Sequence, residues 1–260
     1  MLTKVAAPPR LAFERRGSGP PLLLLHPLGA DRHVWAPVLD RLARERDVIC
    51  VDLPGFGGSG PLEGDNSPPA LALAVAEFAD ALGLGLDGGV HVGGNSLGGW
   101  VALELALAGH VRSVTAIAPA GLWPQPLAPK RGTARAIART LLPLMPTLVR
   151  SAGGRRFALA ATVGDAGRVP PADALRLVRS YATAPGFAAV NAAMRASRFQ
   201  GLERIRVPVT LGWCEFDRLV AKPAHLPSTV RSVDLADCGH VPMWDAPEKV
   251  TNLLLAGSRT

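Results

Sequence analysis

The sequence feature that most constrains the fold is the alternation of short apolar runs with longer segments of helical periodicity. The run PPLLLLHP at residues 20–27 ends at a proline, and residues 33–46 repeat apolar side chains every three or four positions. A continuous apolar run is typical of a strand buried on both faces, and intervening helices connect such strands in parallel. The alternation therefore predicts an α/β fold with a mostly parallel, doubly wound sheet. The predicted strands are 20–27, 47–52, 88–94, 111–119, 207–214 and 230–237, and the predicted helices are 33–46, 68–82, 96–108 and 247–256.

One long segment interrupts this alternation. Residues 122–200 contain no strand-like run, and prolines divide them into stretches of helical spacing. Because the alternation resumes with VPVTLGWC, the segment is predicted to be a helical insertion into a single core. We expect a core domain of residues 1–121 and 201–260 and an insertion of residues 122–200. The helices predicted within the insertion are 131–142, 145–161, 172–182 and 186–197.

Composition restricts the class of protein. Of the 260 residues, 48% are apolar and 19% are charged, which is typical of a chain that folds around a large core. No uninterrupted apolar stretch is long enough to span a bilayer, and the N-terminal MLTKVAAPPR lacks the apolar core of a signal peptide. The three cysteines, Cys50, Cys214 and Cys238, fit neither a disulfide framework nor a zinc site. We therefore predict buried free thiols and a cytoplasmic location.

The net charge of +7 is distributed unevenly. From Leu122 to Arg206 the chain carries 14 Lys and Arg against 3 acidic residues, a balance of +11, so the remaining residues sum to −4. Such a basic segment attracts anionic substrates or surfaces, and the alternative is a solvated arginine-rich face without a ligand. No zinc motif is present and no aromatic residues are interleaved with the basic ones, so we expect no nucleic-acid partner.

The stretch GGNSLGGW, at residues 93–100, lies between a predicted strand and a predicted helix. It contains Gly94-Asn95-Ser96-Leu97-Gly98, which matches the pattern G-x-S-x-G of a sharp strand-to-helix turn. Glycines two positions on either side of the serine leave room where strand and helix meet. The pattern predicts that Ser96 is a nucleophile at the apex of this turn, and the alternative is an ordinary turn with a serine that caps the helix.

A serine nucleophile needs a base, and histidine is the usual one. His91 lies within a predicted strand and is expected in the core, His110 lies at a helix end, and His225 is expected on the surface. His240 follows the last predicted strand, as Ser96 follows an earlier one. Because the carboxyl ends of parallel strands share one edge, His240 is the predicted base.

The histidine in turn needs an acid that fixes its tautomer. Asp217 follows the predicted strand 207–214 and therefore lies at the same edge. Glu215 is close to the strand end, and Asp234 and Asp237 lie in or at the end of the next strand. Among these carboxylates, Asp217 is the predicted acid.

The order Ser96, Asp217, His240 and the motifs around these residues resemble the α/β-hydrolase superfamily over nearly the whole chain. The resemblance implies that two backbone amides form the oxyanion hole. One is that of Leu97, after the nucleophile, and the other is that of Leu28, in the loop after the first long strand. The family usually has His-Gly in this loop, and Pro27 makes it stiffer here without removing the Leu28 donor. The matching motifs are HPLGADRHVW, DLPGFGGSG, GGNSLGGW, GWCEFDRLV and CGHVPMWDAPE.

The insertion is similar to the helical cap that roofs the pocket in this family. The spacing of Arg131, Arg135 and Arg139 predicts a basic outer face on helix 131–142, with apolar side chains such as Ile137 on other faces. We expect an apolar pocket beneath a positive rim. The candidate pocket residues, which ordinary packing would also explain, are His26, Asn95, Trp123, Leu144, Met145, Phe157, Phe187 and Trp244.

The resemblance implies a serine hydrolase that cleaves a carboxylic ester through an acyl-enzyme, without a metal or organic cofactor. The implied partner is a small-molecule ester or lactone, for which the basic cap suits an anionic group; no integral membrane association is expected, and a homodimer is left open. The alternatives are a carbon–carbon bond or enol-lactone hydrolase and a non-catalytic ligand-binding protein. Epoxide hydrolases and haloalkane dehalogenases resemble the chain less, since their nucleophile position holds aspartate where Ser96 stands. Tyr181 is also the only tyrosine in the chain.

Overall fold

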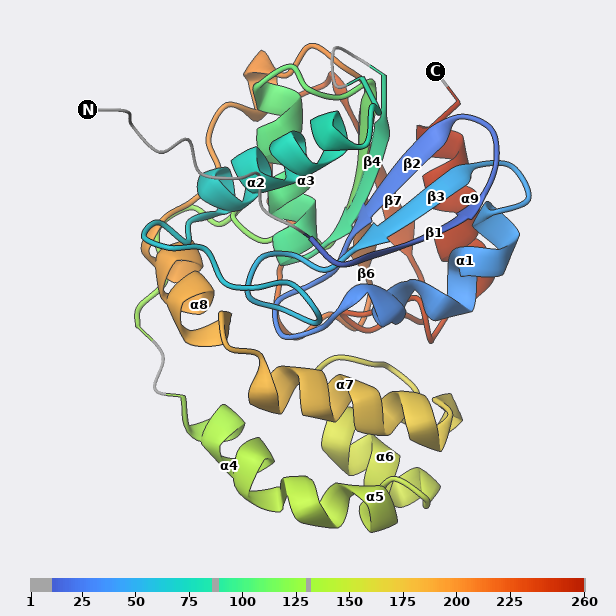
Figure 1. Ribbon diagram of the computed structural model, residues 1–260, viewed down its shortest axis with the longest axis vertical. Coiled ribbons are helices and arrows are strands. Elements are labelled where there is room, and N and C mark those ends of the chain that lie inside the picture. The colour runs from blue at the N-terminus through green and yellow to red at the C-terminus, as the bar shows by residue number, and fades with distance from the viewer. Residues whose placement is uncertain (1–10, 86–88, 130–131, 260) are drawn as a thin grey trace.

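The computed structural model describes residues 11–85, 89–129 and 132–259 and shows a seven-stranded sheet between layers of helices (Figure 1). The strand order is β1-β3-β2-β4-β5-β6-β7, and every neighbouring pair is parallel except β1 with β3. The predicted mostly parallel, doubly wound sheet is confirmed. The strands are β1 (Phe13–Gly17), β2 (Pro21–Leu25), β3 (Asp47–Val51), β4 (His91–Asn95), β5 (Ser113–Ile117), β6 (Val209–Cys214) and β7 (Val230–Leu235).

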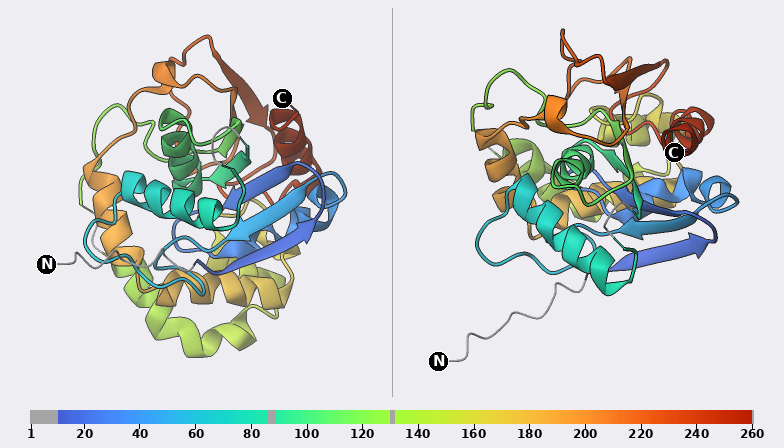
Figure 2. Two further views of the ribbon diagram at one scale, coloured as in Figure 1. Left: turned by 45° about the horizontal axis from the view of Figure 1, so that its top comes forward. Right: turned by 90° about the horizontal axis from the view of Figure 1, so that it is seen from above.

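Helices cover both faces of this sheet. Helices α2 and α3 lie on one face and α1 and α9 on the other, as the view from above shows (Figure 2). All residues of β4, β5 and β6 are therefore buried. In β2, of sequence PLLLL, this burial on both faces corresponds to a continuous apolar run. The helices of the core are η1 (Arg32–Trp35), α1 (Ala36–Leu42), α2 (Pro68–Ala81), α3 (Leu97–Leu107) and α9 (Pro247–Gly257).

Strand β1 is not expected from the sequence pattern, because its residues FERRG are mostly charged and exposed. It pairs antiparallel with β3 at the edge of the sheet. The Arg15 guanidinium lies 2.6 Å from the Asp47 carboxylate of β3 and crosses between the two strands. Charged side chains on an edge strand oppose pairing with another sheet, so this strand carries a polar sequence in place of an apolar run.

Helices occupy the insertion between β5 and β6, which we call the cap (residues 122–200). The predicted single helix 145–161 is wrong, because Ser151 adopts an extended conformation and its Oγ accepts the N–H of Gly154 at 2.9 Å, which starts a new helix. Gly88 and Arg131, the first residues of a predicted strand and a predicted helix, lie outside the described residues. The cap and the segment after it contain α4 (Thr133–Leu141), η2 (Leu142–Leu144), α5 (Met145–Leu148), α6 (Ala152–Leu159), η3 (Ala166–Arg168), α7 (Pro171–Thr183), α8 (Phe187–Ala196) and η4 (Leu202–Arg204).

The buried side chains of the cap join the hydrophobic clusters of the sheet. Val190 of α8 belongs to the cluster that contains the buried residues of α2 and α3, and Met145 of α5 belongs to the cluster that contains those of α1 and α9. A polar contact adds to this packing, because the Ser180 hydroxyl of α7 donates to the Asp31 carboxylate of the core at 2.6 Å. The cap is therefore anchored on both sides of the sheet.

The predicted orientation of the basic cap helix is wrong for Arg135. Its guanidinium turns inward and donates to the backbone carbonyls of Tyr181 and Ala184, at 3.0 and 2.5 Å. The Tyr181 carbonyl lies in the last turn of α7, where no helical N–H is available to it, and Ala184 directly follows the helix. A cation with several donors is favoured at such a helix end. Ile137, expected on an apolar face directed inward, is instead 58% exposed.

All three cysteines are buried and none forms a disulfide, as predicted. Within the described ranges, no helix is long and apolar enough to cross a bilayer. The same part of the chain contains no group of three or more His, Cys, Asp or Glu that could hold a metal ion.

His91 lies in β4 with its Nδ1 2.8 Å from the Ser113 hydroxyl, as expected for a core residue. Burial, and after it the charges of Arg46 and Arg112, lower the pKa of His91 to about 4. The unfolded chain binds a proton at this residue near pH 6.5, at about its ordinary pKa. The stabilisation from neutral His91 is therefore fully present above that pH and is lost as the pH falls toward the folded pKa.

We predict that the free energy of unfolding falls as the pH is lowered from about 6.5 to about 4, and that His91→Gln makes this fall shallower. Urea unfolding followed by circular dichroism at several pH values measures the slope. His225→Gln, at an exposed position, is the matched control and should keep the slope of the native chain. Equal slopes in both variants would contradict the assignment to His91.

Candidate active site

The candidate catalytic residues follow parallel strands that end at one edge of the sheet. Ser96 directly follows β4, Asp217 follows β6 and His240 follows β7, while Leu28 follows β2. The strand order reverses at β2, which lies between β3 and β4. Loops diverge at such a reversal and leave a crevice beyond the strand ends, which is where α/β sheets bind ligands.

Ser96 occupies a strained turn between β4 and α3. Its backbone has φ 55° and ψ −113°, a conformation that residues other than glycine rarely adopt. A Cβ at Gly94 would overlap the backbone of Gly98, and a Cβ at Gly98 would overlap the carbonyl of Leu25. The two glycines of the motif are therefore required for space, because strand and helix meet backbone to backbone.

Backbone bonds hold this turn in place. The Ser96 N–H donates to the Ile117 carbonyl at 2.9 Å, and the Ser96 carbonyl accepts the N–H groups of Trp100 and Ala120, both at 3.0 Å. The serine side chain makes no hydrogen bond that caps α3. The alternative of an ordinary capping serine is therefore wrong, and the hydroxyl is not used by the helix it precedes.

Asp217 and His240 form a buried pair. His240 Nδ1 lies 2.7 Å from Asp217 Oδ2, and Oδ1 accepts the N–H groups of Leu219 and Val220 at 2.7 and 3.0 Å. Burial alone raises the pKa of Asp217, but the hydrogen bond and charge of His240 and the two amides together lower it below its usual value. The carboxylate therefore stays ionised and assigns the proton of the neutral ring to Nδ1.

The other carboxylates near this edge have different partners. Glu215 accepts the N–H of Asp237 at 3.0 Å, and Asp234 pairs with Lys222 at 2.7 Å. Asp217 is thus the carboxylate that the structure brings to His240, as the position after β6 predicts.

Asn95 connects the serine turn with the histidine loop. Its Nδ2 donates to the carbonyls of Ile117 and His240, both at 3.0 Å, and the side chain is fully buried. Its Oδ1 has no hydrogen-bond partner. The expectation that Asn95 lines the pocket is therefore wrong, because its amide is committed to holding two backbone segments together beside Ser96.

The Asp245 carboxylate is a part of the site that the sequence pattern did not indicate. Its Oδ2 accepts the N–H groups of Gly239 and Gly164 at 2.8 and 2.9 Å, and its Oδ1 accepts that of Asp165 at 2.8 Å. One side chain therefore ties the residue before His240 to the cap. The only signal in the sequence is a lone acidic residue in the apolar stretch VPMWDAP, which does not reveal its distant partners.

The two expected oxyanion amides follow residues that are paired in the sheet. Leu25 of β2 is in register with Gly94 of β4, and Leu28 and Leu97 each lie three positions further along. Within the described residues, neither the Leu28 nor the Leu97 N–H donates to a protein acceptor. Both amides are therefore available to a ligand at the same edge.

His26 is a structural residue of this loop and does not line a pocket. It is fully buried, its Nδ1 lies 2.8 Å from the Pro27 carbonyl, and its Nε2 accepts the Leu53 N–H at 2.9 Å. Burial lowers the pKa of this histidine and keeps the ring neutral. His26 therefore fixes the loop that carries Leu28, and its candidate role as a pocket residue is wrong.

The remaining pocket candidates fall into three groups. Leu144 and Phe157 are 63% and 66% exposed, so they enclose no pocket, whereas Met145 is buried in the cap. Trp123 is half-buried, packs edge-on against Trp100 and donates to the Ser197 carbonyl at 2.9 Å. The half-buried residues Phe187 and Trp244 pack against the core clusters.

Comparison with known proteins identifies a family whose sequence pattern the chain matches. The sequence profile described as the alpha/beta hydrolase family matches residues 22–253. An epoxide hydrolase of Mycobacterium tuberculosis is 34% identical over 216 residues, which cover 72% of this chain and 93% of that protein. A pimeloyl-[acyl-carrier protein] methyl ester esterase of Aeromonas hydrophila is 30% identical over 267 residues, which cover 94% of this chain and 97% of that protein.

Solved structures resemble the chain over almost its whole length. A thermophilic esterase from Thermogutta terrifontis, with malate bound, is 26% identical with a TM-score of 0.72, covering 95% of this chain and 92% of that one. An enol-lactonase from Burkholderia xenovorans is 20% identical with a TM-score of 0.73, covering 95% of both chains, and this likeness shows the fold alone.

We predict that Asp245→Ala destabilises the protein by about 2 kcal/mol, because three backbone N–H groups lose their acceptor. Urea unfolding measures this loss, and hydrogen exchange should accelerate at Gly239, Gly164 and Asp165. Asp234→Ala is the control, since its exposed pair with Lys222 contributes less than about 1 kcal/mol. Unchanged exchange at Gly239 in Asp245→Ala would show that the carboxylate does not hold the histidine loop.

Proposed function

Because the chain belongs to the alpha/beta hydrolase family, we propose that it is a serine hydrolase that cleaves carboxylic esters. In this proposal Ser96 is the nucleophile, His240 the general base and Asp217 the residue that orients the histidine. The observation that carries it is the strained turn, which holds the uncommitted hydroxyl of Ser96 at the same sheet edge as the buried His240–Asp217 pair. A serine hydroxyl becomes an effective nucleophile only beside such a base.

In the first half of the reaction, His240 Nε2 takes the proton of Ser96 as Oγ attacks the carbonyl carbon of the ester. The carbonyl oxygen becomes an oxyanion, to which the N–H groups of Leu28 and Leu97 donate. The tetrahedral intermediate then collapses, the C–O bond to the alcohol breaks, and Nε2–H protonates the leaving oxygen. The products of this half are a free alcohol and an acyl ester on Ser96.

In the second half, His240 removes a proton from water, and the hydroxide attacks the acyl carbon. Collapse of the second tetrahedral intermediate breaks the bond to Ser96 Oγ, which regains its proton from Nε2, and the carboxylic acid leaves. Asp217 remains a carboxylate in both halves, consistent with its lowered pKa, and stabilises the imidazolium that forms twice. Each oxyanion donor contributes roughly 3–4 kcal/mol to transition-state stabilisation.

Ester cleavage is favoured over epoxide opening and dehalogenation by the nucleophile itself. The relatives include proteins named epoxide hydrolase and fluoroacetate dehalogenase. The family resemblance implies an aspartate at the nucleophile position of epoxide hydrolases and haloalkane dehalogenases. This chain has Ser96 at that position, and its Tyr181 packs edge-on against Phe187. The relatives named pimeloyl-[acyl-carrier protein] methyl ester esterase fit the proposed reaction.

We expect a fluorophosphonate probe to label the native protein at one site and to leave Ser96→Ala unlabelled. Asp217→Asn should slow labelling by about 10³- to 10⁴-fold, because an amide no longer selects the reactive tautomer of His240. Intact-mass spectrometry measures the adduct, and a peptide map locates it. Equal labelling of the native protein and Ser96→Ala, or no labelling of either, would refute the serine-hydrolase proposal and favour a ligand-binding protein.

The arginine-rich cap favours one second candidate, a hydrolase of carbon–carbon bonds or enol lactones in carboxylate-bearing substrates. A chain-length series of p-nitrophenyl esters, assayed beside a dienoic diketone acid, separates the two reactions. We expect kcat/KM to be higher for the best ester. Efficient cleavage of the diketone with negligible ester turnover would replace the ester proposal by the second candidate.

A further inference from the structure

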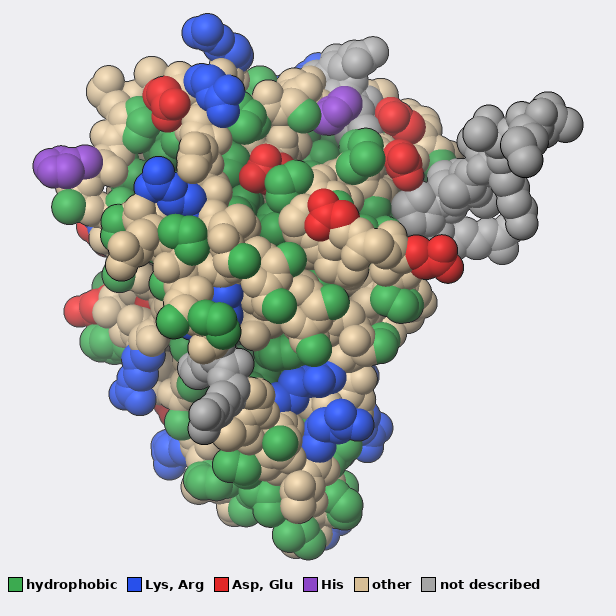
Figure 3. All heavy atoms as spheres, turned by 90° about the vertical axis from the view of Figure 1, so that its left-hand side faces the viewer, with side chains coloured by type: hydrophobic (Ala, Val, Ile, Leu, Met, Phe, Trp, Pro, Cys, Tyr) green, Lys and Arg blue, Asp and Glu red, His purple; other side chains and the backbone are tan. Residues whose placement is uncertain are grey.

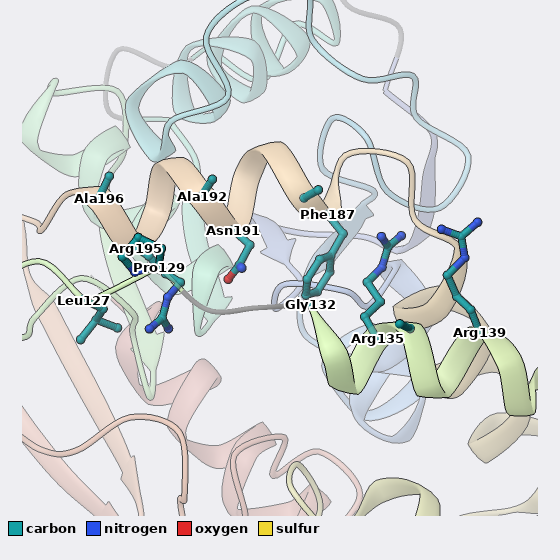
Figure 4. A pocket seen from close by; sticks show the side chains of 12 residues that line it. Leu127, Pro129, Gly132, Arg135, Arg139, Phe187, Asn191, Ala192, Arg195 and Ala196 are labelled. Carbon is teal, nitrogen blue, oxygen red and sulfur yellow. The ribbon is translucent and has the colours of Figure 1, made fainter.

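A hollow of about 840 Å³ lies between α4 and α8 of the cap (Figure 4). Residues of both helices and of the segment before α4 line it, whereas Ser96, Asp217 and His240 do not. The hollow is therefore a space outside the proposed catalytic residues that the reaction described above does not use.

Among the described residues, three arginines and no acidic residue line this hollow. Arg135 and Arg139 extend from α4, and Arg195 extends from α8 (Figure 4). The described cap contains two acidic residues, Asp165 and Asp173, and neither lines the hollow. Figure 3 shows the same imbalance on a larger scale, with Lys and Arg side chains over the cap in its lower half and most acidic side chains over the core. The positive charge of the hollow is therefore not balanced by nearby carboxylates of the described chain.

Protein contacts fix two of these guanidinium groups. Arg135 is held by the carbonyls that end α7 and stacks over the Phe187 ring at 4.9 Å. Arg195 donates Nε–H and Nη2–H to the Ala128 carbonyl, at 2.9 and 2.5 Å. Each group keeps further N–H donors, and a guanidinium that is already immobilised loses little entropy when it binds an anion.

Arg139 differs from the other two. Its side chain is exposed and, in the described part of the chain, makes no hydrogen bond or ion pair with a protein group. It lies one helical turn from Arg135, and the pKa of Arg135 is lowered first by burial and then by the charge of Arg139. Two like charges side by side are unfavourable until an anion lies between them.

The rest of the lining is suited to an organic chain. Apart from the arginines, the side chains that line the hollow are mainly apolar, with the amide of Asn191 pointing in from α8 (Figure 4). Phe187 links this lining to the proposed reaction centre. A Cβ on Gly29 would lie 3.1 Å from the Phe187 ring, and Gly29 directly follows Leu28, a proposed oxyanion donor. A ligand whose apolar chain lies along Phe187 thus has the anion-binding arginines at one end and the loop that contains Leu28 near the other.

We propose that this hollow is a binding subsite for an oxyanion group, a carboxylate or a phosphate monoester, at the end of an apolar chain whose ester is cleaved at Ser96. Arg135 and Arg139 contact the oxyanion group and Phe187 contacts the chain, while Arg195 adds to the positive potential. This subsite rests on the proposed function for its role as part of a substrate site, but ligand binding to it can be measured without catalysis.

A second hollow, of about 450 Å³, lies between core residues such as Asp31 and Asp52 and residues 172–185 of the cap, and it provides a contrast. Its lining includes Arg32 together with Asp52, and the Arg32 guanidinium is paired with the Asp52 carboxylate. The hydroxyl of Ser180 in this lining is likewise engaged by Asp31. Arg176 and Arg179 also line this second hollow, but the carboxylates of Asp31 and Asp52 balance part of the positive charge there. The arginine-lined hollow between α4 and α8, in which no described carboxylate takes part, is therefore the better candidate for an anion.

Binding is tested by calorimetry in the Ser96→Ala background, with adipate, hexyl phosphate and neutral dimethyl adipate as probes. We expect at least one anion to bind and the neutral diester to bind at least tenfold more weakly. Adding Arg139→Gln should weaken anion binding about tenfold, because one charge-assisted contact is lost. Adding Arg150→Gln, which removes the same charge from an exposed cap position outside the hollow, should change it less than about twofold.

The outcomes separate the subsite from the proposed function. The subsite is refuted if Arg139→Gln and Arg150→Gln weaken binding equally, if neither anion binds, or if dimethyl adipate binds as tightly as the anions. Tighter binding of adipate or of hexyl phosphate identifies the oxyanion as carboxylate or phosphate. If Arg139→Gln selectively loses anion binding and the fluorophosphonate does not label the native protein, the subsite is supported and the hydrolase proposal is refuted. With intact labelling, Arg139→Gln should lower the preference for monomethyl over dimethyl adipate, measured as the ratio of their kcat/KM values, about tenfold.

Discussion

Helix α3 touches strands β2 and β4 backbone to backbone, and the geometry of the candidate site depends on this contact. Gly94 and Gly98 leave no side chain between the segments. The backbone of Ser96, which lies between these glycines, has a positive φ. The same contact sets the first amide of α3, at Leu97, near the loop that follows Leu25. The close approach of the two backbones thus sets the position of Ser96 and of the Leu97 amide beside it.

Buried polar bonds then bring the remaining parts of the site to this turn. Asn95 joins the serine turn to the His240 carbonyl, Asp217 holds the imidazole, and Asp245 joins the histidine loop to the cap. The bond from Asn95 is fully buried, and in such a region of low dielectric constant a formed bond is strengthened and a lost partner is costly. The site is therefore held by a chain of bonds that runs from β4 to the cap. The cap segment near Gly164 meets the histidine loop through the Asp245 carboxylate and through the Val241 N–H, which donates to the Thr162 carbonyl at 2.7 Å.

The arginines of the cap serve more than one physical purpose. Arg135 satisfies the carbonyls at the end of α7 and at the same time lines the hollow beside α8. Arg139 makes no such protein contact. Since the cap shares its buried side chains with the core clusters, its basic residues are presented on a support that is continuous with the sheet. A segment that reads as uniformly basic in the sequence thus divides into structural cations and cations available to a ligand.

Local pattern and chain order determined much of this protein. Apolar runs predicted buried strands such as β2, the G-x-S-x-G turn predicted the conformation around Ser96, and positions after β6 and β7 selected Asp217 and His240. The tertiary structure decided the edge strand β1, the break between α5 and α6, the inward turn of Arg135 and the partners of Asn95 and Asp245. Helical and strand periodicity depends on residues a few positions apart, whereas the bond from Asn95 to His240 joins residues 145 positions apart. Such a bond exists only after the sheet has aligned its strand ends, so no local pattern encodes it.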